Sequence, residues 1–474
     1  MLVGVFERSD SPVLTPAGRQ LDVQLGGELG EHLRRSYFDG SFASMETVCF
    51  AEPGRGARYV VLVGLGTRER LDTQRLRTLS ALAVRRLDRW PAVASILHDA
   101  LEGDDAQAAS CEGLRLGTYR FTGKPADDAG PRRIVIVDAS VHALRGADVM
   151  SGAAGLVRDL VNQPASVCCP LDLARAAVHA LQQCPDVTVT IAEQEELSAR
   201  GFGAILAVGR GSAQRPCLTT IEYHPPRSTI HVALVGKGVT FDAGGITPKS
   251  VLGMQGMKTD MAGAATVIGV VQAAALLRLP LHLTGILPAA ENMPDGNSYR
   301  PGDVITHYGG RTTEIIDPDA EGRLLLADGI AFAAELNPDV IVDLGTLTSI
   351  ISMALGPKAF GIFSNRKQLG DQIESAAGLA GERAWQLPLL DVYRGELISD
   401  FADSINCART ANGGAISAAL FLEQFVPADT AWAHLDIAGA ARAESPFEEY
   451  TRGATAVPIR TIVRWCQQQA GGPA

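Results

Sequence analysis

The sequence predicts an α/β protein built from two domains, each a mixed sheet flanked by helices. Strand-like segments alternate with helix-like segments along the chain, which is typical of sheets whose faces are covered by helices. At 474 residues the chain is too long for one ordinary domain. The 50 glycines and the low aromatic content, 5% of the chain, suit closely packed helices and frequent strand-to-helix turns. We therefore expect one small domain and one large one.

The first part of the chain, residues 1–150, is predicted to form the small α/β domain. Residues 58–66, RYVVLVGLG, indicate a buried strand that ends in a glycine turn, and residues 132–140, RRIVIVDAS, indicate another. Between them, residues 71–87 have helical periodicity with a basic outer face. The GLG at 64–66 lacks the third glycine of a dinucleotide-binding fingerprint, so it indicates an ordinary turn.

The larger domain is predicted over residues 151–474 and opens with an interdomain helix at about 151–163, closed by Pro164. Residues 260–279 are apolar on nearly all sides and therefore predict a buried helix. Further strands are expected at 230–235, 281–291 and 339–348, and a second buried helix at 414–425.

Composition and charge exclude several classes of function. The net charge of −11 argues against nucleic acid as a partner, since phosphate binding needs a basic surface. The eight cysteines form no CxxC pair, so we expect reduced thiols in a cytoplasmic protein. The N-terminus meets a charge at Glu7 and does not read as a signal peptide. The longest apolar stretch, 263–277, is shorter than a membrane span, so no membrane partner is expected.

Charged side chains gather at places where a strand ends or a helix begins, which is where ligand sites of open α/β sheets form. The segments are GKGVTFDAGGITPK at 236–249, MKTDMAGAA at 257–265, DPDAEGRLLLADG at 317–329 and LGTLTS at 344–349. In one cleft their carboxylates would repel one another, and divalent cations remove that cost. No histidine pair has HxH or HExxH spacing, so an oxygen-rich site is expected. The candidate residues are Lys237, Asp242, Lys249, Asp260, Asp317, Asp319, Glu321 and Arg323.

Each candidate also has an ordinary structural interpretation. Lys237 and Lys249, taken alone, are better explained as exposed lysines. Asp260 is equally well explained as a helix N-cap. Asp319 and Glu321 are equally well explained as first-turn carboxylates favoured by the helix dipole, and the aspartate of the glycine-rich loop as a turn residue. Only their joint occurrence favours a metal site.

Three of these segments resemble the signature sequences of a known family. GKGVTFDAGG, KTDMAGAA and DPDAEGRLLLADG are similar to segments of the leucyl aminopeptidases, the two-metal, hexameric cytosolic exopeptidases of peptidase family M17. VRDLVNQPAS resembles their interdomain helix, VGLGTRERL their N-terminal domain, and GGAISAALFLEQF with AWAHLDIAGAA the end of their catalytic domain. The resemblance covers most of the chain and implies a catalytic domain of the zinc-exopeptidase type, preceded by a macro-like domain that serves assembly.

The resemblance implies a metal-binding role for five residues. Lys237 and Asp260 would bind the exchangeable ion, and Asp319 would bind the other ion through its side chain and its carbonyl. Asp242 and Glu321 would bridge both ions. A lysine can bind a metal only when neutral, so its pKa must be lowered by the cations and by burial. The implied cofactors are two divalent ions per subunit, Mn²⁺ or Zn²⁺, with Mg²⁺ as a third candidate.

Two further residues resemble catalytic groups of the family. Lys249 would polarise the scissile carbonyl and stabilise the oxyanion. Arg323 would hold a bicarbonate that relays a proton, and its place at a helix N-terminus favours an anion. The residues expected to bind substrate in an apolar pocket are Met257, Thr346, Leu347 and Ala454.

Three departures from the family pattern lie near the expected site. Asp317-Pro318 replaces the usual Asn-Thr, and the second residue brings a fixed φ and no backbone N–H. Ser349-Ile350 replaces a Gly-Ala pair, and Ala454 stands where some members place a methionine. The first departure would alter the metal environment, and the others would shift preference toward larger first residues.

The sequence thus predicts a metalloaminopeptidase that releases leucine or other apolar residues from peptides with a free N-terminus. A cytoplasmic homohexamer is expected, without a membrane or nucleic-acid partner. The alternative is a metal-binding paralogue with weak or no peptidase activity and a regulatory or assembly role. Both interpretations predict bound metal, so turnover is the observation that separates them.

Overall fold

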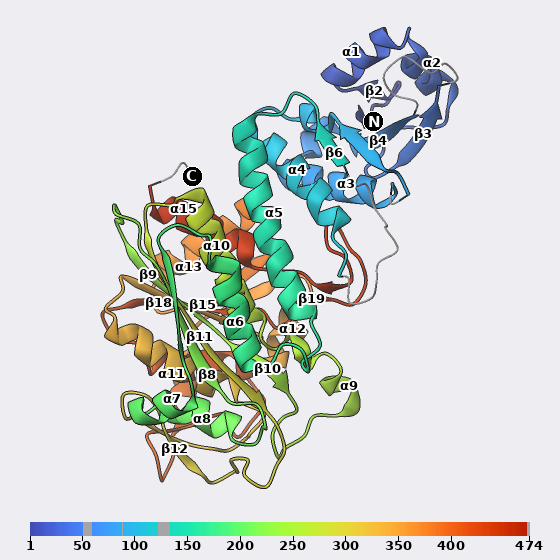
Figure 1. Cartoon of the computed structure of the whole chain (residues 1–474). Coiled ribbons are helices and arrows are strands. Elements are labelled where there is room, and N and C mark those ends of the chain that lie inside the picture. The colour runs from blue at the N-terminus through green and yellow to red at the C-terminus, as the bar shows by residue number, and fades with distance from the viewer. Residues whose placement is uncertain (51–58, 88, 122–132, 472–474) are drawn as a thin grey trace. The chain divides into compact units, whose positions relative to one another are not determined.

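The computed structural model describes residues 1–50, 59–87, 89–121 and 133–471. The chain divides into two units, of which unit 1 is Met1–Gly155 with Ser445–Arg452 and unit 2 is Leu156–Glu444 with Gly453–Ala474. Helix α5, Val141–Asn162, contains the first division point (Figure 1). The first residues of two predicted strands, 58 and 132, lie outside the described residues.

Unit 1 is a mixed sheet with helices on both faces. Its elements are β1 Leu2–Phe6, β2 Val13–Leu14, α1 Pro16–Gln24, α2 Glu28–Arg35, β3 Met45–Cys49, β4 Tyr59–Gly66, η1 Arg68–Arg70, α3 Thr73–Arg85, β5 Ala92–Ser95, η2 Leu97–Ala100, α4 Asp104–Thr118 and β6 Arg133–Ile136. Within the described residues the sheet order is β3-β4-β1-β5-β6, with β2 paired to β1. Alternate residues of β4 enter two cores: Val61 and Val63 lie with residues of α3 and α4, and Val60 and Leu62 with residues of α2.

Unit 2 is built on a larger mixed sheet. In the part that the structure describes, nine strands form this sheet in the order β16-β15-β18-β14-β9-β11-β8-β7, with β10 paired to β11. These strands are β7 Val187–Ala192, β8 Cys217–Tyr223, β9 His231–Gly236, β10 Gly238–Asp242, β11 His282–Asn292, β14 Val340–Gly345, β15 Phe360–Ser364, β16 Ala384–Gln386 and β18 Ala431–Asp436. Five short strands lie outside it: β12 Val304–Thr306, β13 Thr312–Glu314, β17 Ser404–Ile405, β19 Arg442–Ala443 and β20 Gly453–Ala454.

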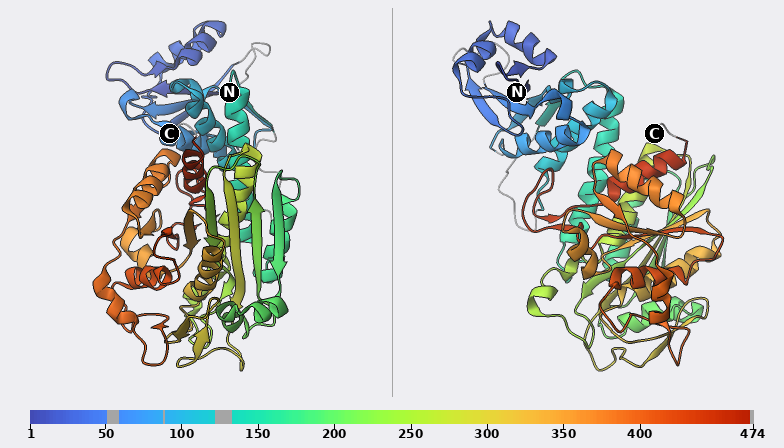
Figure 2. Two further views of the ribbon diagram at one scale, coloured as in Figure 1. Left: turned by 90° about the vertical axis from the view of Figure 1, so that its left-hand side faces the viewer. Right: turned by 180° about the vertical axis from the view of Figure 1, so that it is seen from behind.

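Helices cover both faces of the unit 2 sheet (Figure 2). The helices of unit 2 are α6 Pro170–Leu181, α7 Gln194–Arg200, α8 Gly203–Gly209, α9 Val251–Met254, η3 Met257–Thr259, α10 Ala262–Leu277, α11 Gly322–Glu335, α12 Ser349–Leu355, α13 Lys367–Ala380, η4 Asp391–Leu397, α14 Gly414–Glu423 and α15 Ile459–Gln469. α10 packs on β9, β11 and β14 together with α6 and α15, and α11 packs on the same strands with α8 and α14. Strands buried on both faces explain the continuous apolar runs in the sequence.

The predicted elements are confirmed, with three shifted boundaries. The strand predicted at 132–140 ends at Ile136, and the strand predicted at 339–348 ends at Gly345. The interdomain helix ends at Asn162 as expected, but it begins at Val141 rather than near residue 151. Ser140 precedes it, and the hydroxyl of Ser140 accepts a hydrogen bond from Ala143 N at 3.1 Å. A serine in this position caps a helix start, and the glycines at 146 and 152 obscured the signal.

One segment is more apolar than the sequence analysis allowed. Val251–Leu277 reaches the length and composition of a membrane span, although we judged that no stretch did. This segment is longer than the apolar stretch at 263–277 because it also includes the turn before α10, together with the charged residues of that turn. In the structure 83% of its most apolar window is buried inside the protein, as in the core helix of a globular fold.

Candidate metal centre

The carboxyl ends of neighbouring parallel strands meet at one edge of the unit 2 sheet and carry polar side chains there. β9 runs parallel to β11 and β14, β10 runs parallel to β11, and β14 runs parallel to β18. Ligand sites in α/β proteins form at such an edge. The residues at these strand ends are Lys237 after β9, Asp242 on β10, Asn292 on β11, Thr346 after β14 and Asp436 on β18.

Two helices begin at the same edge and add two carboxylates. Asp260 comes just before α10, but the N-cap of that helix is Met261, so the capping interpretation of Asp260 is wrong. Glu321 is the N-cap of α11 but makes no side-chain capping bond. Both carboxylates instead contact Lys237, so neither has a capping role.

Lys237 is buried among carboxylates, so the exposed-lysine interpretation is wrong. Its side chain is 3% exposed, and Nζ lies 2.8 Å from Asp260 Oδ2 and 2.9 Å from Glu321 Oε1. Nζ also donates to Asp260 Oδ1 at 2.8 Å and to the carbonyl of Thr346 at 2.9 Å. Gly345 leaves room for the lysine stem, because a Cβ there would lie 2.7 Å from Lys237 Cβ. The sequence packs small residues where this side chain must pass.

Lys249 joins the two remaining carboxylates. Its Nζ lies 2.7 Å from Asp242 Oδ2 and 2.6 Å from Asp319 Oδ1, and its side chain is only 17% exposed. The second oxygen of Asp242, Oδ1, accepts from Gly244 N at 2.9 Å, so this residue also has the turn role that the sequence allowed. Six of the eight predicted charged residues, the two lysines with Asp242, Asp260, Asp319 and Glu321, are therefore brought together.

The cluster carries more negative than positive charge. Four carboxylates face two lysines, which leaves a surplus of two negative charges when all are ionised. Burial and the neighbouring carboxylates raise the pKa of Glu321, and they raise the pKa of Asp319 to about 6. Burial lowers the pKa of Lys237, but the charges of Asp260, Glu321 and Asp242 outweigh it, and the net pKa is raised. Among protein groups alone, Lys237 is therefore an ammonium ion.

The residues of this cluster fit divalent cations. One ligand oxygen each from Asp242, Asp319 and Glu321 lies within 4.8 Å of the others. Asp260 Oδ2 and Asp319 Oδ1 are buried without an aligned hydrogen bond, although lysine nitrogens lie 2.8 Å and 2.6 Å away. The lysines thus leave oxygen lone pairs unsatisfied, and a surplus of carboxylate oxygens is the donor set that hard and borderline cations prefer.

Arg323 lies in the first turn of α11 and retains donor capacity. The residue is 7% exposed, and its Nη1 donates to the carbonyl of Asn406 at 3.0 Å. Its Nε is buried and has no hydrogen-bond partner among the described residues. A buried guanidinium with a spare donor at a helix N-terminus suits a small anion.

Comparison with known proteins identifies the family. Residues 155–463 match the profile of the cytosol aminopeptidase family, catalytic domain, and residues 2–124 match its N-terminal domain. The chain belongs to this family. It is therefore a peptidase of the metal-dependent M17 type, and the resemblance noted in the sequence is confirmed.

Close relatives of the cytosol aminopeptidase family span nearly the whole chain. A probable cytosol aminopeptidase of Syntrophotalea carbinolica is 40% identical and covers 99% of this chain and 97% of its own length. The probable cytosol aminopeptidase of Roseiflexus castenholzii is 41% identical over 86% of both chains.

Solved structures of the family share the fold. The bottromycin maturation enzyme BotP in complex with Mn is 35% identical, with a TM-score of 0.87 over 92% of this chain and 96% of that one. The cytosol aminopeptidase of Coxiella burnetii is 31% identical, with a TM-score of 0.86 over 99% and 97%. The catalytically weak paralogue, our alternative reading of the sequence, is not favoured by these comparisons.

The departure at Asp317-Pro318 keeps the local turn intact. Asp317 Oδ1 accepts from Asp319 N at 2.9 Å and from Thr247 Oγ1 at 2.9 Å. The side-chain oxygen of an asparagine could accept the same bonds, so the aspartate is a turn residue as well as an extra charge. The carbonyl of Pro318 accepts from Tyr299 Oη at 2.6 Å. The missing N–H of the proline therefore leaves the hydrogen bonds of this turn in place.

The sequence analysis missed four polar residues, of which Asn292 contacts the cluster and the other three hold the turns and loops beside it. Asn406 grips the Asp317 turn: its Oδ1 accepts from Ile316 N at 2.7 Å and its Nδ2 donates to Asp317 O at 2.6 Å. Three of them carry neutral amides or a hydroxyl, which add nothing to a charge surplus, and the fourth, a carboxylate, lies outside the charge-rich segments. The position of Asn292 directly after the strand predicted at 281–291 was the one available signal. The four residues are Asn292, Tyr299, Asn406 and Asp436.

The expected substrate-binding residues are distributed around this edge. Thr346 Oγ1 donates to Asp260 Oδ1 at 2.6 Å, and Leu347 follows it in the loop after β14. Met257 begins η3, and its carbonyl accepts from Asp260 N at 3.3 Å. Ala454 is 1% exposed, and none of its hydrogen bonds reaches the charged cluster within the described residues.

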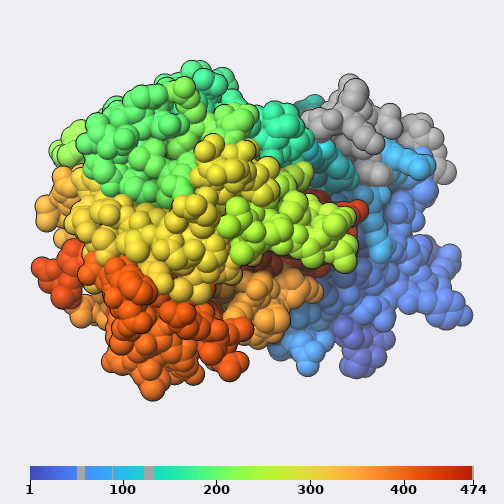
Figure 3. Space-filling model, turned by 90° about the horizontal axis from the view of Figure 1, so that it is seen from below, coloured from blue at the N-terminus to red at the C-terminus, as the bar shows by residue number. Residues whose placement is uncertain are grey.

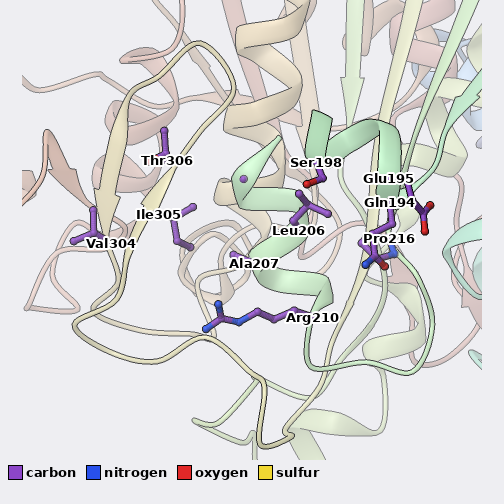
Figure 4. Close-up of a pocket in the computed structure, with 11 residues that line it drawn as sticks. Gln194, Glu195, Ser198, Leu206, Ala207, Arg210, Pro216, Val304, Ile305 and Thr306 are labelled. Atoms are coloured by element: carbon purple, nitrogen blue, oxygen red, sulfur yellow. The ribbon is translucent and has the colours of Figure 1, made fainter. Parts of the chain in front are cut away.

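One pocket lies apart from the residues of the charged cluster. It has a volume of about 770 Å³ and is lined by residues of α7, α8 and β12 (Figure 4). Arg210 lines it but is paired with Asp303 at 3.1 Å. The pocket shares no lining residue with the charged cluster, so it is not the candidate metal centre.

Proposed function

We propose that the chain is a two-metal aminopeptidase that releases N-terminal leucine or other apolar residues from peptides. The observation that carries this proposal is the buried cluster of four carboxylates and two lysines at the carboxyl edge of the unit 2 sheet. Membership of the cytosol aminopeptidase family supports the reaction class. The preference for leucine and the number of ions rest on the resemblance of the signature segments.

Five residues would hold the ions. Lys237 and Asp260 would bind one, Asp319 the other, and Asp242 and Glu321 both. Bound divalent cations lower the pKa of a water and fix the free amine of a substrate. Lys237 must lose its proton to bind, and a cation beside it favours that loss by replacing the attraction of the carboxylates. Mn²⁺ is the first candidate because the BotP structure holds Mn, and Zn²⁺ and Mg²⁺ follow.

Two residues would act on the substrate directly. Lys249 Nζ lies between Asp242 and Asp319, so these two carboxylates hold its ammonium group in a fixed position. We assign to it the stabilisation of the oxyanion that forms on the scissile carbonyl. Arg323 would hold bicarbonate through its unpaired Nε, and that anion would take the proton of the attacking water.

The first side chain of the peptide would contact Met257, Thr346, Leu347 and Ala454. The apolar Met257 and Leu347 favour leucine-like residues, and the small Ala454 leaves space for larger ones. Hydrolysis of a panel of amino-acid amides measures this preference, and a strict preference for small residues would contradict it.

The resemblance to the family also implies an assembly state and a location in the cell. We propose that residues 1–150 serve assembly of a homohexamer and that the chain acts in the cytoplasm on free peptides. Light scattering at micromolar concentration tests the assembly, and a monodisperse monomer would refute it.

Hydrolysis of leucine p-nitroanilide after incubation with Mn²⁺ tests the activity. Release of p-nitroaniline that Lys249→Ala abolishes is the expected result, because the variant keeps every proposed metal ligand. If the wild type binds two Mn²⁺ per chain but cleaves neither this substrate nor a panel of dipeptides, the paralogue reading replaces the proposal.

A further inference from the structure

The amide of Asn292 lies among oxygens of the two carboxylates proposed to bridge the ions. Its Nδ2 donates to Asp242 Oδ1 at 2.9 Å and to the Pro318 carbonyl at 3.0 Å, and it lies 3.5 Å from Glu321 Oε2. We infer that Asn292 is a positioning residue that sets which oxygens Asp242 and Glu321 present to the metal ions. The inference rests on the proposed function and deepens it.

The sheet fixes Asn292 beside Asp242. β10 and β11 are parallel, and Asp242 and Asn292 are direct register partners at their carboxyl ends. The main chains are joined again just beyond, where Ala243 N donates to Asn292 O at 2.9 Å. Partners in register on adjacent strands project on the same side of a sheet. The contact between amide and carboxylate is therefore a consequence of strand register rather than of loop conformation.

Each bridging carboxylate has one oxygen near the amide and one near a lysine. Asp242 Oδ1 accepts from Asn292 and from Gly244 N, whereas Oδ2 lies 2.7 Å from Lys249 Nζ. Glu321 Oε2 lies at the long limit of a hydrogen bond from Asn292, whereas Oε1 lies 2.9 Å from Lys237 Nζ. Neutral donors thus hold Asp242 Oδ1 and face Glu321 Oε2, whereas Asp242 Oδ2 and Glu321 Oε1 face the cationic groups.

The orientation of the amide is fixed by its surroundings and has a cost. Turned over, Asn292 would place its own oxygen against three other oxygens, which is repulsive, so the nitrogen must face the cluster. Asn292 is fully buried, and its Oδ1 then has no hydrogen-bond partner among the described residues. A buried acceptor without a partner lowers the stability of the fold. This loss accompanies an amide whose nitrogen holds Asp242 and faces Glu321.

Tyr299 provides a matched control. Its hydroxyl donates to the same Pro318 carbonyl that Asn292 contacts, at 2.6 Å, and it is equally buried. Tyr299→Phe therefore removes one hydrogen bond to the turn while leaving both carboxylates held. Asn292→Leu removes the bond to the turn and the contacts to the carboxylates while keeping the number and branching of side-chain heavy atoms, and Asn292→Ala removes them without a bulky group.

Calorimetric titration of the full-length, chelator-treated chain with Mn²⁺ tests the inference, with circular dichroism to show that each variant is folded. We expect Asn292→Leu and Asn292→Ala to weaken Mn²⁺ affinity by about tenfold or more, as loss of an outer partner of a metal ligand does. Tyr299→Phe should stay within about threefold of the wild type. If the leucine variant does not fold, the alanine variant decides.

Wild-type affinity in either folded Asn292 variant overturns the inference. An equal loss in Tyr299→Phe also overturns it, because Asn292 would then act through the Pro318 turn alone. A wild type that binds two Mn²⁺ but releases no leucine contradicts the proposed peptidase while the effect of Asn292 on metal binding still stands. A wild type that binds no Mn²⁺ overturns both.

Discussion

Lys237 and Gly322 are in such close contact that any side chain at position 322 would have to displace the lysine. A Cβ built there would lie 2.3 Å from Lys237 Cε and 2.6 Å from its Nζ. Gly322 is the first residue of α11, directly after Glu321, so the glycine lets the helix start against the lysine. The backbone at the start of α11 and the side chain of Lys237 therefore pack directly against each other within the charged cluster.

Gly322→Ala should displace Lys237. The methyl group forces the lysine away from Asp260 and Glu321, and we expect the free energy of unfolding to fall by about 1–3 kcal/mol and Mn²⁺ binding to weaken. Urea unfolding and Mn²⁺ titration measure the two effects. Gly378→Ala in α13 is the control, because a Cβ there meets nothing within 4 Å and a helical alanine stabilises by up to about 1 kcal/mol. If the two variants had the same unfolding free energy and the same Mn²⁺ affinity, the close packing of Gly322 on Lys237 would be contradicted.

Asp317 should tolerate asparagine better than alanine. Asp317→Asn keeps an oxygen for Asp319 N and Thr247 Oγ1, so we expect its unfolding free energy to stay within about 0.5 kcal/mol of the wild type. Asp317→Ala loses both bonds and should cost about 1–2 kcal/mol. Thermal or urea unfolding of the two variants gives the comparison. If both lose the same stability, the charge of Asp317 matters and the turn does not.

The raised pKa of Asp319 predicts a pH dependence of stability in chelator-treated protein. Burial and the charge of Asp242 raise that pKa to about 6 from an ordinary value of 3.8. The folded chain then binds the proton more tightly than the unfolded chain, so this contribution is full below pH 3.8 and is lost as the pH rises to 6. Asp319→Asn should therefore flatten the decline in unfolding free energy across this window.

Excess Mn²⁺ should oppose that decline, because cation binding needs the ionised carboxylate and strengthens as the pH rises. Urea unfolding at steps between these two pH values, with chelator and with Mn²⁺, measures both trends. An unchanged slope in Asp319→Asn would assign the pH dependence to other groups.

Asp436 should control the loop after β14. Its carboxylate accepts from Leu347 N at 3.2 Å and from Thr348 N and Oγ1 at 3.1 Å and 2.6 Å. Asp436→Asn replaces one acceptor by a donor, and we expect KM for leucine p-nitroanilide to rise about tenfold with a smaller change in kcat, a loss of about 1.4 kcal/mol. The surface variant Asp303→Asn is the control and should change neither. A fall in kcat alone would contradict a role in substrate positioning.

The short helix α9 carries two exposed apolar side chains. Val251 and Leu252 in α9 are 78% and 81% exposed, and the light-green segment that contains them lies on the face seen in Figure 3. Sequence periodicity did not indicate α9, because the helix is only four residues long. Its neighbour α10, which is long and apolar on all sides, was predicted correctly because burial on every side leaves a continuous apolar run.

The charged residues of the site could be recognised in the sequence because like charges crowd at the ends of apolar segments. Lys237 and Lys249 could not be separated from surface lysines by their own surroundings in the chain, and only burial against carboxylates distinguishes them. Asn292 and Asn406 were missed for a similar reason. Their partners lie 26 to 90 residues away, so the sequence near them carries no sign of the contacts.

The sequence by itself determined the alternation of strands and helices, the buried character of α10 and the family to which the chain belongs. These depend on periodicity and on short segments, which are local properties. Tertiary structure alone decided which oxygen of each carboxylate meets a lysine and which meets an amide. It also decided that Ser445–Arg452 belongs to unit 1. Such contacts depend on strand register, as between Asp242 and Asn292, and on close packing against glycine, as between Lys237 and Gly322. Both are set by residues far apart in the chain that meet only when the sheet has formed.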